Sequence, residues 1–469
     1  MRPIPLRDLR GAVFGKVDAP LPASAPPIRC VCTDSRDIKP DSVFFAIPGD
    51  HFDGHDYVND AFDKGAVVAI VDREITPPAG KFIIEVPDVR KALGRLASHV
   101  RDGMRATKII AVAGSVGKTG TKHLVHAALG ARLPGGMSPK SFNNDIGVPL
   151  TIFAAESHWQ YLVLEMGTNH PGEIAHLSRT AKPDLAIITN AGEEHLEHLG
   201  SLDGVRHENA QVVVGMDAAR GLLVINGDDP DLERAVDGWW KGRSLTFGNH
   251  RPDDDEGNDV EQADLFATDV EVGWDGTRFN LNGSRTKLHV PQLGAHVATN
   301  ALAAVAVARR LGLGDQEIAA GLAKATGPEM RLQPTSMPVD GGVVKVLNDA
   351  YNANPPSVRA ALATLAALPY DGRRVVALGD MFELGETGPG HHYAIGRLAA
   401  KTADVLVLVG NLMCQHAAEA AGTVEDCEVH TFPDVAAAKA ELPTLLQPGD
   451  TLLVKGSRGM AMERVVKSE

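Results

Sequence analysis

Short apolar runs alternate with helix-length stretches along most of this chain, and that rhythm predicts an α/β protein. Aliphatic runs of about five residues are typical of strands in a parallel sheet, because helices cover both faces of such a sheet. In the middle of the chain these runs lie at Tyr161–Glu165, Leu185–Asn190 and Leu222–Asn226. Val270–Leu281 instead alternates in a hairpin-like way around a Trp-Asp-Gly-Thr turn. We therefore expect mostly parallel sheets with one hairpin-like segment.

The α/β rhythm recurs in three blocks, which predicts three domains, because 469 residues are too many for one core. We expect a small α/β N-terminal domain over residues 1–105, a central domain with a mostly parallel sheet over 106–328, and a Rossmann-like C-terminal domain over 329–469. Further strands are expected at 28–32, 42–49, 66–72, 82–86, 343–347, 374–378, 405–409 and 452–454. Helices are expected at Thr299–Leu311 and Val358–Leu368.

One strand–loop–helix unit carries the strongest chemical signal. A strand at Ile109–Val112 precedes a glycine loop, and an apolar-periodic helix begins near Lys118. The backbone N–H groups of such a loop converge on phosphate oxygens, and the helix N-terminus adds partial positive charge. Position 112 is Val where the full Walker pattern has Gly, so a plain glycine turn is the alternative. The pattern predicts a site for a nucleoside triphosphate, formed by Gly114, Ser115, Val116, Gly117, Lys118 and Thr119, which we call the phosphate loop.

Polar residues follow two neighbouring apolar runs of the central block. Glu165 ends one run, and His195 lies just beyond the next. Because the carboxyl ends of parallel strands share one edge of a sheet, both side chains could join Thr119 around Mg²⁺. Carboxylate oxygen is a preferred ligand of this ion, whereas imidazole is a less usual one. A surface or helix-capping role for His195 therefore stays open.

Loops at other strand ends are weaker candidates, each with a plain structural alternative. Thr33-Asp34-Ser35-Arg36 and Pro48–Gly54 follow two N-terminal strands, where they suit a small ligand or an Asx turn. Asn143-Asn144 precedes a helix and is either a pair of ligand-binding amides or an ordinary turn. Asp349–Asn352 and Lys455–Arg458 follow C-terminal strands, where charged residues hold anions or are simply solvated.

Composition excludes several classes of protein. The net charge of −14 disfavours nucleic acid or an anionic membrane as a general partner, and no apolar run is long enough to span a membrane. The start of the chain has no signal pattern, so we expect a cytoplasmic location. The acidic run between Asp253 and Asp264 predicts a solvated loop rather than a cation site, because it lacks EF-hand spacing. Buried, reduced thiols are expected at Cys30, Cys32, Cys414 and Cys427.

Taken together, these segments resemble the Mur ligases, ATP-dependent enzymes that form amide bonds in peptidoglycan precursor synthesis. TDSR with FFAIPGDHFDGHDYV fits that family's UDP-sugar-binding N-terminal domain, and GSVGKTGTK fits its shortened phosphate loop. NNDIGVPLT, EMGTNHPGEI and HLEHLGSLDGV fit the central ATP-binding domain, and LGDMFELG fits the C-terminal ligase domain. DAYNANPPS and KGSRGMAMERVV resemble the members that add D-alanyl-D-alanine to UDP-N-acetylmuramoyl-tripeptide through an acyl phosphate.

The resemblance implies a role for residues at matching positions. Lys118, Glu165 and His195 would be catalytic, with Thr119, Glu165 and His195 as Mg²⁺ ligands. His296 and Asn300 would contact the adenosine part of ATP. Arg331, Asp349 and Asn352 would close onto the nucleotide. Substrate contacts would come from Thr33, Asp34, Ser35 and Arg36 near the uridine nucleotide, from Asn143 and Asn144, and from Lys455 and Arg458 on the dipeptide side.

Two positions depart from the family pattern. Asn209 stands where these enzymes carry a carbamylated lysine, and neighbouring Glu208 could replace it only if the helix turned it inward. Val297 stands where an Asn is usual beside the His, which affects the adenine contacts. A related ligase with another acceptor, or an ATP-binding partner protein with impaired catalysis, therefore stays as an alternative. We expect a monomer.

Overall fold

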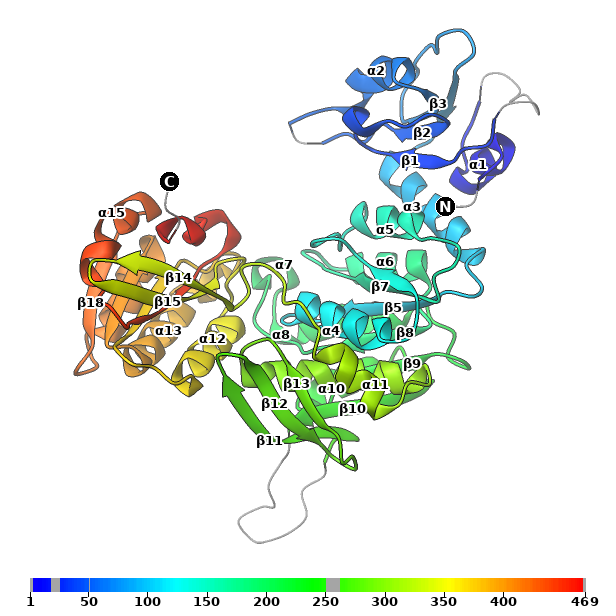
Figure 1. The fold of residues 1–469 in the computed structure, drawn as a ribbon. Helices are drawn as coiled ribbons and strands as arrows, with labels where there is room; N and C mark the ends of the chain where they lie inside the picture. Colours follow the sequence, from blue (N-terminus) through cyan, green and yellow to red (C-terminus); the bar gives the residue numbers. More distant parts are fainter. Residues whose placement is uncertain (1–2, 18–25, 50, 250–261, 467–469) are drawn as a thin grey trace.

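The computed structural model describes residues 3–17, 26–49, 51–249 and 262–466, and the strands in these residues form three sheets (Figure 1). Each sheet belongs to a separate body, with the C-terminal domain beside the central domain. The predicted three-domain α/β architecture is confirmed, whereas the boundaries near residues 105 and 328 stay predictions. The acidic residues at 253–261 lie outside the described residues.

The N-terminal domain contains β1 (Cys30–Cys32), β2 (Ser42–Phe45), β3 (Ala66–Val71), β4 (Phe82–Glu85), α1 (Leu6–Val13), α2 (Val58–Asp63) and α3 (Val89–Asp102). Within the described residues its sheet is fully parallel in the order β1-β2-β3-β4. Helix α3 also reaches the central domain, where Arg101 Nη2 donates to Asp184 Oδ2 at 2.7 Å. Its apolar residues share one core with both domains, so α3 joins the two.

The central domain carries the largest sheet. Its strands are β5 (Lys108–Ala113), β6 (Gly135–Met137), β7 (Tyr161–Glu165), β8 (Leu185–Ile188), β9 (Leu222–Asn226), β10 (Arg243–Asn249), β11 (Leu265–Gly273), β12 (Gly276–Leu281) and β13 (Lys287–Val290). Its helices are α4 (Lys118–Gly130), α5 (Gly147–Ala154), α6 (Glu173–Ala181), α7 (Leu196–Leu199), α8 (Leu202–Ala210), α9 (Pro230–Asp237), α10 (Ala295–Arg310) and α11 (Asp315–Leu322). Among the described residues the strand order is β13-β12-β11-β10-β9-β8-β5-β7-β6, parallel from β6 to β11, and β11–β12 is the predicted antiparallel hairpin.

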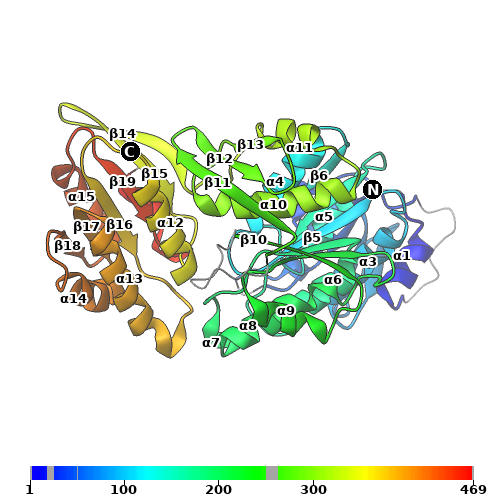
Figure 2. The same cartoon turned by 90° about the horizontal axis from the view of Figure 1, so that it is seen from below.

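Alternate residues of β5 point into two different cores, which explains its unbroken apolar run. Ile109 and Ala111 pack with residues of α3, α5 and α6, whereas Ile110 and Val112 pack with α4, α10 and α11. Figure 2 shows α4, α10 and α11 on one side of the sheet and α6, α8 and α9 on the other. A strand covered on both faces must be apolar at every position, so the phosphate loop begins from a rigid support.

The C-terminal domain contains β14 (Gln333–Val339), β15 (Gly342–Asp349), β16 (Arg374–Gly379), β17 (Val405–Val409), β18 (Glu428–Phe432) and β19 (Thr451–Lys455). Its helices are α12 (Pro355–Ala367), α13 (Gly388–Thr402), α14 (Ala418–Ala421) and α15 (Val435–Leu445). In the described part of the chain its sheet has the order β14-β15-β19-β16-β17-β18, and only the edge strand β14 is antiparallel. Asp349 and Lys455 therefore end adjacent parallel strands and face the same edge.

Some expected features differ in detail. β8 ends at Ile188, two residues before the predicted end, because the next two residues turn to contact the phosphate loop. Helix α10 begins four residues before the predicted start, at Ala295, so that His296 lies in its first turn. The four cysteines are free thiols as expected, but only Cys32 is buried and the others are half-buried. Within the described residues, every helix is too short or too polar to cross a membrane.

Candidate active site

A cavity of about 1110 Å³ lies between the central and C-terminal domains. The carboxyl edge of the central sheet forms one wall, and loops of the C-terminal sheet form the other. From the predicted site residues, it brings together Ser115, Val116, Gly117, Lys118, Thr119, Asn143, Asn144, Glu165, His195, His296, Asn300, Arg331, Asp349, Asn352 and Lys455. The prediction that several strand ends meet at the edge of the phosphate loop is confirmed.

The phosphate loop owes its shape to glycine. Gly114 has a φ of +124°, and a Cβ atom there would lie 2.2 Å from Thr189 Oγ1. Gly117 has a φ of +88°, and α4 begins directly after it. Residues beyond β8 hold the loop from one side: Val116 N–H donates to Asn190 Oδ1 at 2.9 Å. The backbone is therefore fixed before any ligand binds.

Asn209 on α8 holds the start of the phosphate loop. Its Oδ1 accepts a hydrogen bond from Gly114 N–H at 2.8 Å, and its Nδ2 donates to Val205 O at 3.0 Å. The side chain is only 1% exposed, so both groups would lose their partners if it were removed. Because α8 carries both Asn209 and Val205, this amide ties the start of the phosphate loop to that helix.

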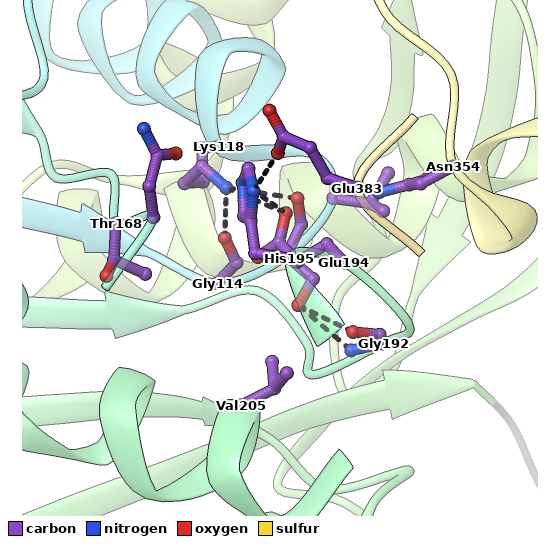
Figure 3. A network of polar contacts seen from close by, with 12 residues as sticks. Gly114, Lys118, Thr168, Gly192, Glu194, His195, Val205, Asn354 and Glu383 are labelled. Atoms are coloured by element: carbon purple, nitrogen blue, oxygen red, sulfur yellow. Dashed lines mark hydrogen bonds and ion pairs between the residues drawn. The ribbon is translucent and has the colours of Figure 1, made fainter. Parts of the chain in front are cut away.

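Lys118 lies folded over its own loop (Figure 3). Its Nζ donates to Gly114 O and, at 3.0 Å, to Ser115 O, and it lies 3.6 Å from Glu194 Oε2. Glu194 is buried, and burial raises the pKa of its carboxyl against the opposing effect of the Lys118 ammonium. The ammonium group thus stands at the loop, where incoming phosphate oxygens could replace the backbone carbonyls.

Glu165 is paired with a buried lysine that the sequence analysis missed. Lys122, on the second turn of α4, is 0% exposed, and its Nζ lies 3.0 Å from Glu165 Oε2. The same ammonium donates to Lys140 O, while Glu165 Oε1 accepts from Asn143 Nδ2 at 3.1 Å. Lys122 therefore supplies the charge that balances the Glu165 carboxylate, and it links α4 to the end of β7 and to the loop between β6 and α5.

His195 takes its partner from the other domain. Its Nδ1 is hydrogen-bonded to Glu383 Oε2, which lies between β16 and α13 of the C-terminal domain. Its Nε2 lies 4.0 Å from Glu194 Oε2, on the side of the phosphate loop (Figure 3). The ring is therefore held between two carboxyl groups, one from each domain.

The C-terminal domain reaches the phosphate loop directly. Arg331 Nη2 donates to Thr119 Oγ1 at 3.1 Å, and its guanidinium stacks on the Tyr351 ring at 4.4 Å. The Tyr351 hydroxyl in turn lies 2.6 Å from Ser141 Oγ in the central domain. These contacts bring a cation from the C-terminal domain to the first turn of α4.

Asp349 and Lys455 form a buried ion pair behind this wall. Lys455 Nζ donates to Asp349 Oδ2 at 2.6 Å and to Asn352 O at 2.9 Å. Burial lowers the pKa of Lys455, while the Asp349 charge acts in the opposite direction. The Lys455 ammonium is thus hydrogen-bonded within the C-terminal domain. These bonds support a structural role for Lys455 as well as a substrate contact.

The adenosine-side candidates lie at the start of α10. The Asn300 amide lies over Gly117, where an added Cβ would be 3.0 Å from it. His296 lines the same cavity, and burial lowers the pKa of its imidazole. Val297, the departure noted beside it, is buried in the core and also lines the cavity, where it presents an apolar side chain.

The remaining predicted residues either lie outside the cavity or, like Asn144, line it but have a structural partner of their own. Thr33, Asp34, Ser35 and Arg36 lie in the N-terminal domain, where hydrogen bonds from Arg36 lower the pKa of Asp34 to about 2. Asn144 forms the ordinary turn that was predicted as its alternative role, since its Oδ1 accepts a hydrogen bond from Gly147 N–H at 2.8 Å. Arg458 is not among the described residues that line the cavity, and its guanidinium lies 3.0 Å from Glu463.

Comparisons with known proteins cover nearly the whole chain. The family model described as Mur ligase family, catalytic domain, matches residues 27–101; the Mur ligase middle domain matches 112–308; and the Mur ligase, glutamate ligase domain, matches 330–458. The chain belongs to the Mur ligase family. The resemblance inferred from its motifs is therefore confirmed.

Named Mur ligases show how far this similarity extends. UDP-N-acetylmuramoyl-tripeptide–D-alanyl-D-alanine ligase of Bacillus subtilis (strain 168) is 34% identical over 451 residues, covering 94% of this chain and 93% of that protein. The Escherichia coli (strain K12) protein of the same name is 34% identical over 442 residues, with 93% of each chain covered. A crystal structure of MurF from Acinetobacter baumannii, 30% identical, matches with a TM-score of 0.86 over 99% of this chain and 98% of that one.

Helix α8 carries Asn209 and Glu208, the residues at which a departure from the family pattern was inferred, and the structure gives each of them a role. Asn209 clamps Gly114, as described above. Glu208 accepts hydrogen bonds from Gly172 N–H at 2.7 Å and Ile174 N–H at 2.8 Å, so it holds the start of α6. Neither Asn209 nor Glu208 is among the described residues that line the cavity, so Glu208 does not take the place of the expected carbamate.

Proposed function

We propose that the protein is an ATP-dependent ligase that joins D-alanyl-D-alanine to UDP-N-acetylmuramoyl-tripeptide. The observation that carries this proposal is the cavity in which the phosphate loop faces the C-terminal domain. That arrangement suits an enzyme that activates one substrate with ATP and then presents it to a second. The substrates themselves are suggested by the whole-chain similarity to ligases named for them.

ATP is the best-supported ligand of the phosphate loop. A MurF ligase from Thermotoga maritima, 26% identical with a TM-score of 0.79, has been crystallised in complex with ADP. In this chain the backbone of the phosphate loop would receive the phosphates, with Lys118 at the outer ones. Asn300 and His296 would bound the adenosine, and Arg331 would approach the phosphates from the opposite wall.

The residues present fit Mg²⁺. Among the described residues no group of three His, Cys, Asp or Glu side chains could hold a metal alone. Mg²⁺ does not need such a cage, because it keeps several waters and uses one or two carboxylates together with substrate phosphates. Glu165 would supply a buried carboxylate, whose Oε2 accepts no hydrogen bond but faces the Lys122 ammonium at 3.0 Å, so a bound ion would share this carboxylate with Lys122. Thr119 Oγ1 and the His195 ring would be the further protein ligands. When bound, the ion would neutralise charge on the transferring phosphoryl oxygens.

The reaction would proceed in two displacements. A terminal carboxylate oxygen of the UDP-linked tripeptide attacks the γ-phosphorus of ATP, so that ADP leaves and an acyl phosphate forms. The amine of D-alanyl-D-alanine then attacks the acyl carbon, inorganic phosphate leaves, and the amine loses a proton. Lys118 and Arg331 would stabilise the charge that spreads over the phosphoryl oxygens.

The domain arrangement fits the lifetime of this intermediate. An acyl phosphate hydrolyses in water, so the site must exclude solvent while it exists. Contacts of the Arg331 and Tyr351 side chains with the central domain would close the cavity over it. The N-terminal loop at Thr33–Arg36 would hold the uridine end of the substrate, and Asn143 and Lys455 are further candidates near the acceptor.

The test is phosphate release in the presence of ATP, the UDP-muramoyl tripeptide and D-alanyl-D-alanine. We expect release to need both acceptors and to fall at least about 100-fold in Lys118→Ala, the loss typical of one transition-state donor. The matched control is Lys401→Ala, an exposed lysine at the end of α13. ATP binding without acceptor-dependent release would contradict the proposal and favour a catalytically impaired binding protein. Running the assay with tripeptides ending in diaminopimelate and in lysine defines the acceptor.

A further inference from the structure

Glu383 contacts the His195 ring from outside the central domain. Its Oε2 is hydrogen-bonded to His195 Nδ1, although the two residues are 188 positions apart in the sequence. Both have a left-handed backbone, with a φ of +49° at His195 and +62° at Glu383. Residues other than glycine adopt this conformation infrequently, and it clusters at functional sites.

The chemistry of this contact decides which ring nitrogen carries the proton. A carboxylate only accepts hydrogen bonds, so Nδ1 of His195 must be the donor. In the neutral ring, Nε2 then has a free lone pair. Nε2 lies on the side of Glu194 and the phosphate loop (Figure 3). A lone pair at this position suits a cation and does not suit a phosphate oxygen.

The two residues before Glu383 are anchored in the C-terminal domain. The preceding residue, Phe382, donates its N–H to Ser457 Oγ at 2.9 Å, and Met381 N–H donates to the buried His392 ring at 3.0 Å. Across the domain boundary, Glu197 N–H points to Glu383 O at 3.5 Å, so the segment touches the first turn of α7. The carboxylate therefore reaches His195 only where the C-terminal domain is docked as it is here.

We propose that Glu383 is a positioning residue, which orients the His195 ring for cation binding when the C-terminal domain docks. The proposal rests on the function proposed above, since it assumes that Mg²⁺ accompanies ATP at this edge. A carboxylate behind a ligating imidazole fixes the tautomer and ring orientation, and its removal typically lowers metal affinity about 10- to 100-fold. Docking of the domain and assembly of the cation site would thus be one event.

A second ion pair between the same domains provides the control. Arg359 Nη2 on α12 lies 3.2 Å from Glu193 Oε1, and both side chains are partly exposed. Arg359→Ala removes a contact between the domains without touching the His195 ring. If Glu383 acted only by holding the domains together, the two variants would behave alike.

The experiment measures how tightly Mn²⁺, used in place of Mg²⁺, binds to the enzyme–ADP complex by electron paramagnetic resonance. We expect Glu383→Ala to weaken Mn²⁺ binding about 10- to 100-fold, and Arg359→Ala to leave it unchanged. His195→Ala should weaken binding similarly, and the double variant Glu383→Ala/His195→Ala should be no weaker than His195→Ala alone. Glu383→Gln keeps an acceptor for Nδ1–H and should retain most of the affinity, which also controls for folding.

Three outcomes would overturn the proposal: unchanged Mn²⁺ affinity in Glu383→Ala, an equal loss in Arg359→Ala, or additive losses in the double variant. The wild-type assay for acceptor-dependent phosphate release is run on the same preparation. Its failure contradicts the proposed function, whereas an active wild type with a tight-binding Glu383→Ala contradicts the positioning role alone.

Discussion

Lys122→Met tests the buried charge pair at the base of the active site. Lys122 is 0% exposed and Glu165 is 2% exposed, with Lys122 Nζ and Glu165 Oε2 3.0 Å apart. Methionine is an unbranched side chain of similar length, so the change removes the charge and little volume. Glu165 is then left as a buried carboxylate without its balancing cation.

The expected cost follows from this burial. Removing one partner of a buried ion pair destabilises a protein by about 3–5 kcal/mol, because the other charge stays buried without a partner. In a domain of roughly 200 residues, each 1 kcal/mol corresponds to about 2–4 °C in the midpoint of unfolding, so a fall of roughly 6–20 °C is expected. Lys122→Met/Glu165→Gln removes both charges and should recover most of the loss.

Hydrogen exchange in peptides that cover β5 and β7 is a suitable assay, because unfolding of three domains is not a two-state process. The matched control is Lys108→Met, which breaks an exposed pair with Asp184 at 3.1 Å. We expect less than about 1 kcal/mol from that change. The reasoning is refuted if Lys122→Met is no more destabilising than Lys108→Met, or if the double variant is as unstable as the sum of its single changes.

Three further changes test the fixed backbone of the phosphate loop and the titration of His123 on α4. Gly114→Ala places a Cβ atom 2.2 Å from Thr189 Oγ1, on a backbone with a φ of +124°, so we expect it to abolish binding of a fluorescent ADP analogue. The control is Gly238→Ala, which has open space around the added Cβ atom and should bind the analogue normally. Asn209→Ala leaves Gly114 N–H without its hydrogen-bond acceptor, which costs about 1–3 kcal/mol at the phosphate loop. We expect this change to raise KM for ATP, and Asn209→Asp to restore the acceptor. Burial, and after it the charge of Lys122, lowers the pKa of His123 from 6.5 to about 4. Between pH 4 and pH 6.5 the folded protein therefore binds fewer protons than the unfolded chain. Stability should therefore fall as the pH drops from 6.5 to 4, and urea titrations should show a weaker fall in His123→Asn.

Much of the site follows from topology alone. Once the apolar runs are identified as parallel strands, their carboxyl ends must share an edge, so the phosphate loop, Glu165 and His195 could be placed together from the sequence. The glycines of the loop also carry a local signal, because a positive φ disfavours residues with a Cβ atom. These features depend on short stretches of chain, and short stretches are what a sequence pattern describes.

Other features depend on contacts that no local pattern reveals. Lys122 follows a helix start and resembles a surface lysine, yet the end of β7 covers it with a carboxylate. Asn209 draws attention in the sequence because a charged ligand is missing there, whereas the structure shows a clamp on Gly114. Glu383 reaches His195 from another domain, and only the docking of that domain brings the two side chains together.

The central claim is that a triphosphate at the phosphate loop activates a carboxylic acid, from which an amine displaces phosphate. Oxygen-18 in the terminal carboxylate of the UDP-linked tripeptide tests it most directly, with the released phosphate analysed by mass spectrometry. The acyl-phosphate route requires one labelled oxygen to move from the carboxylate to inorganic phosphate for each amide bond formed. Phosphate released together with the amide product but free of the label would contradict the account.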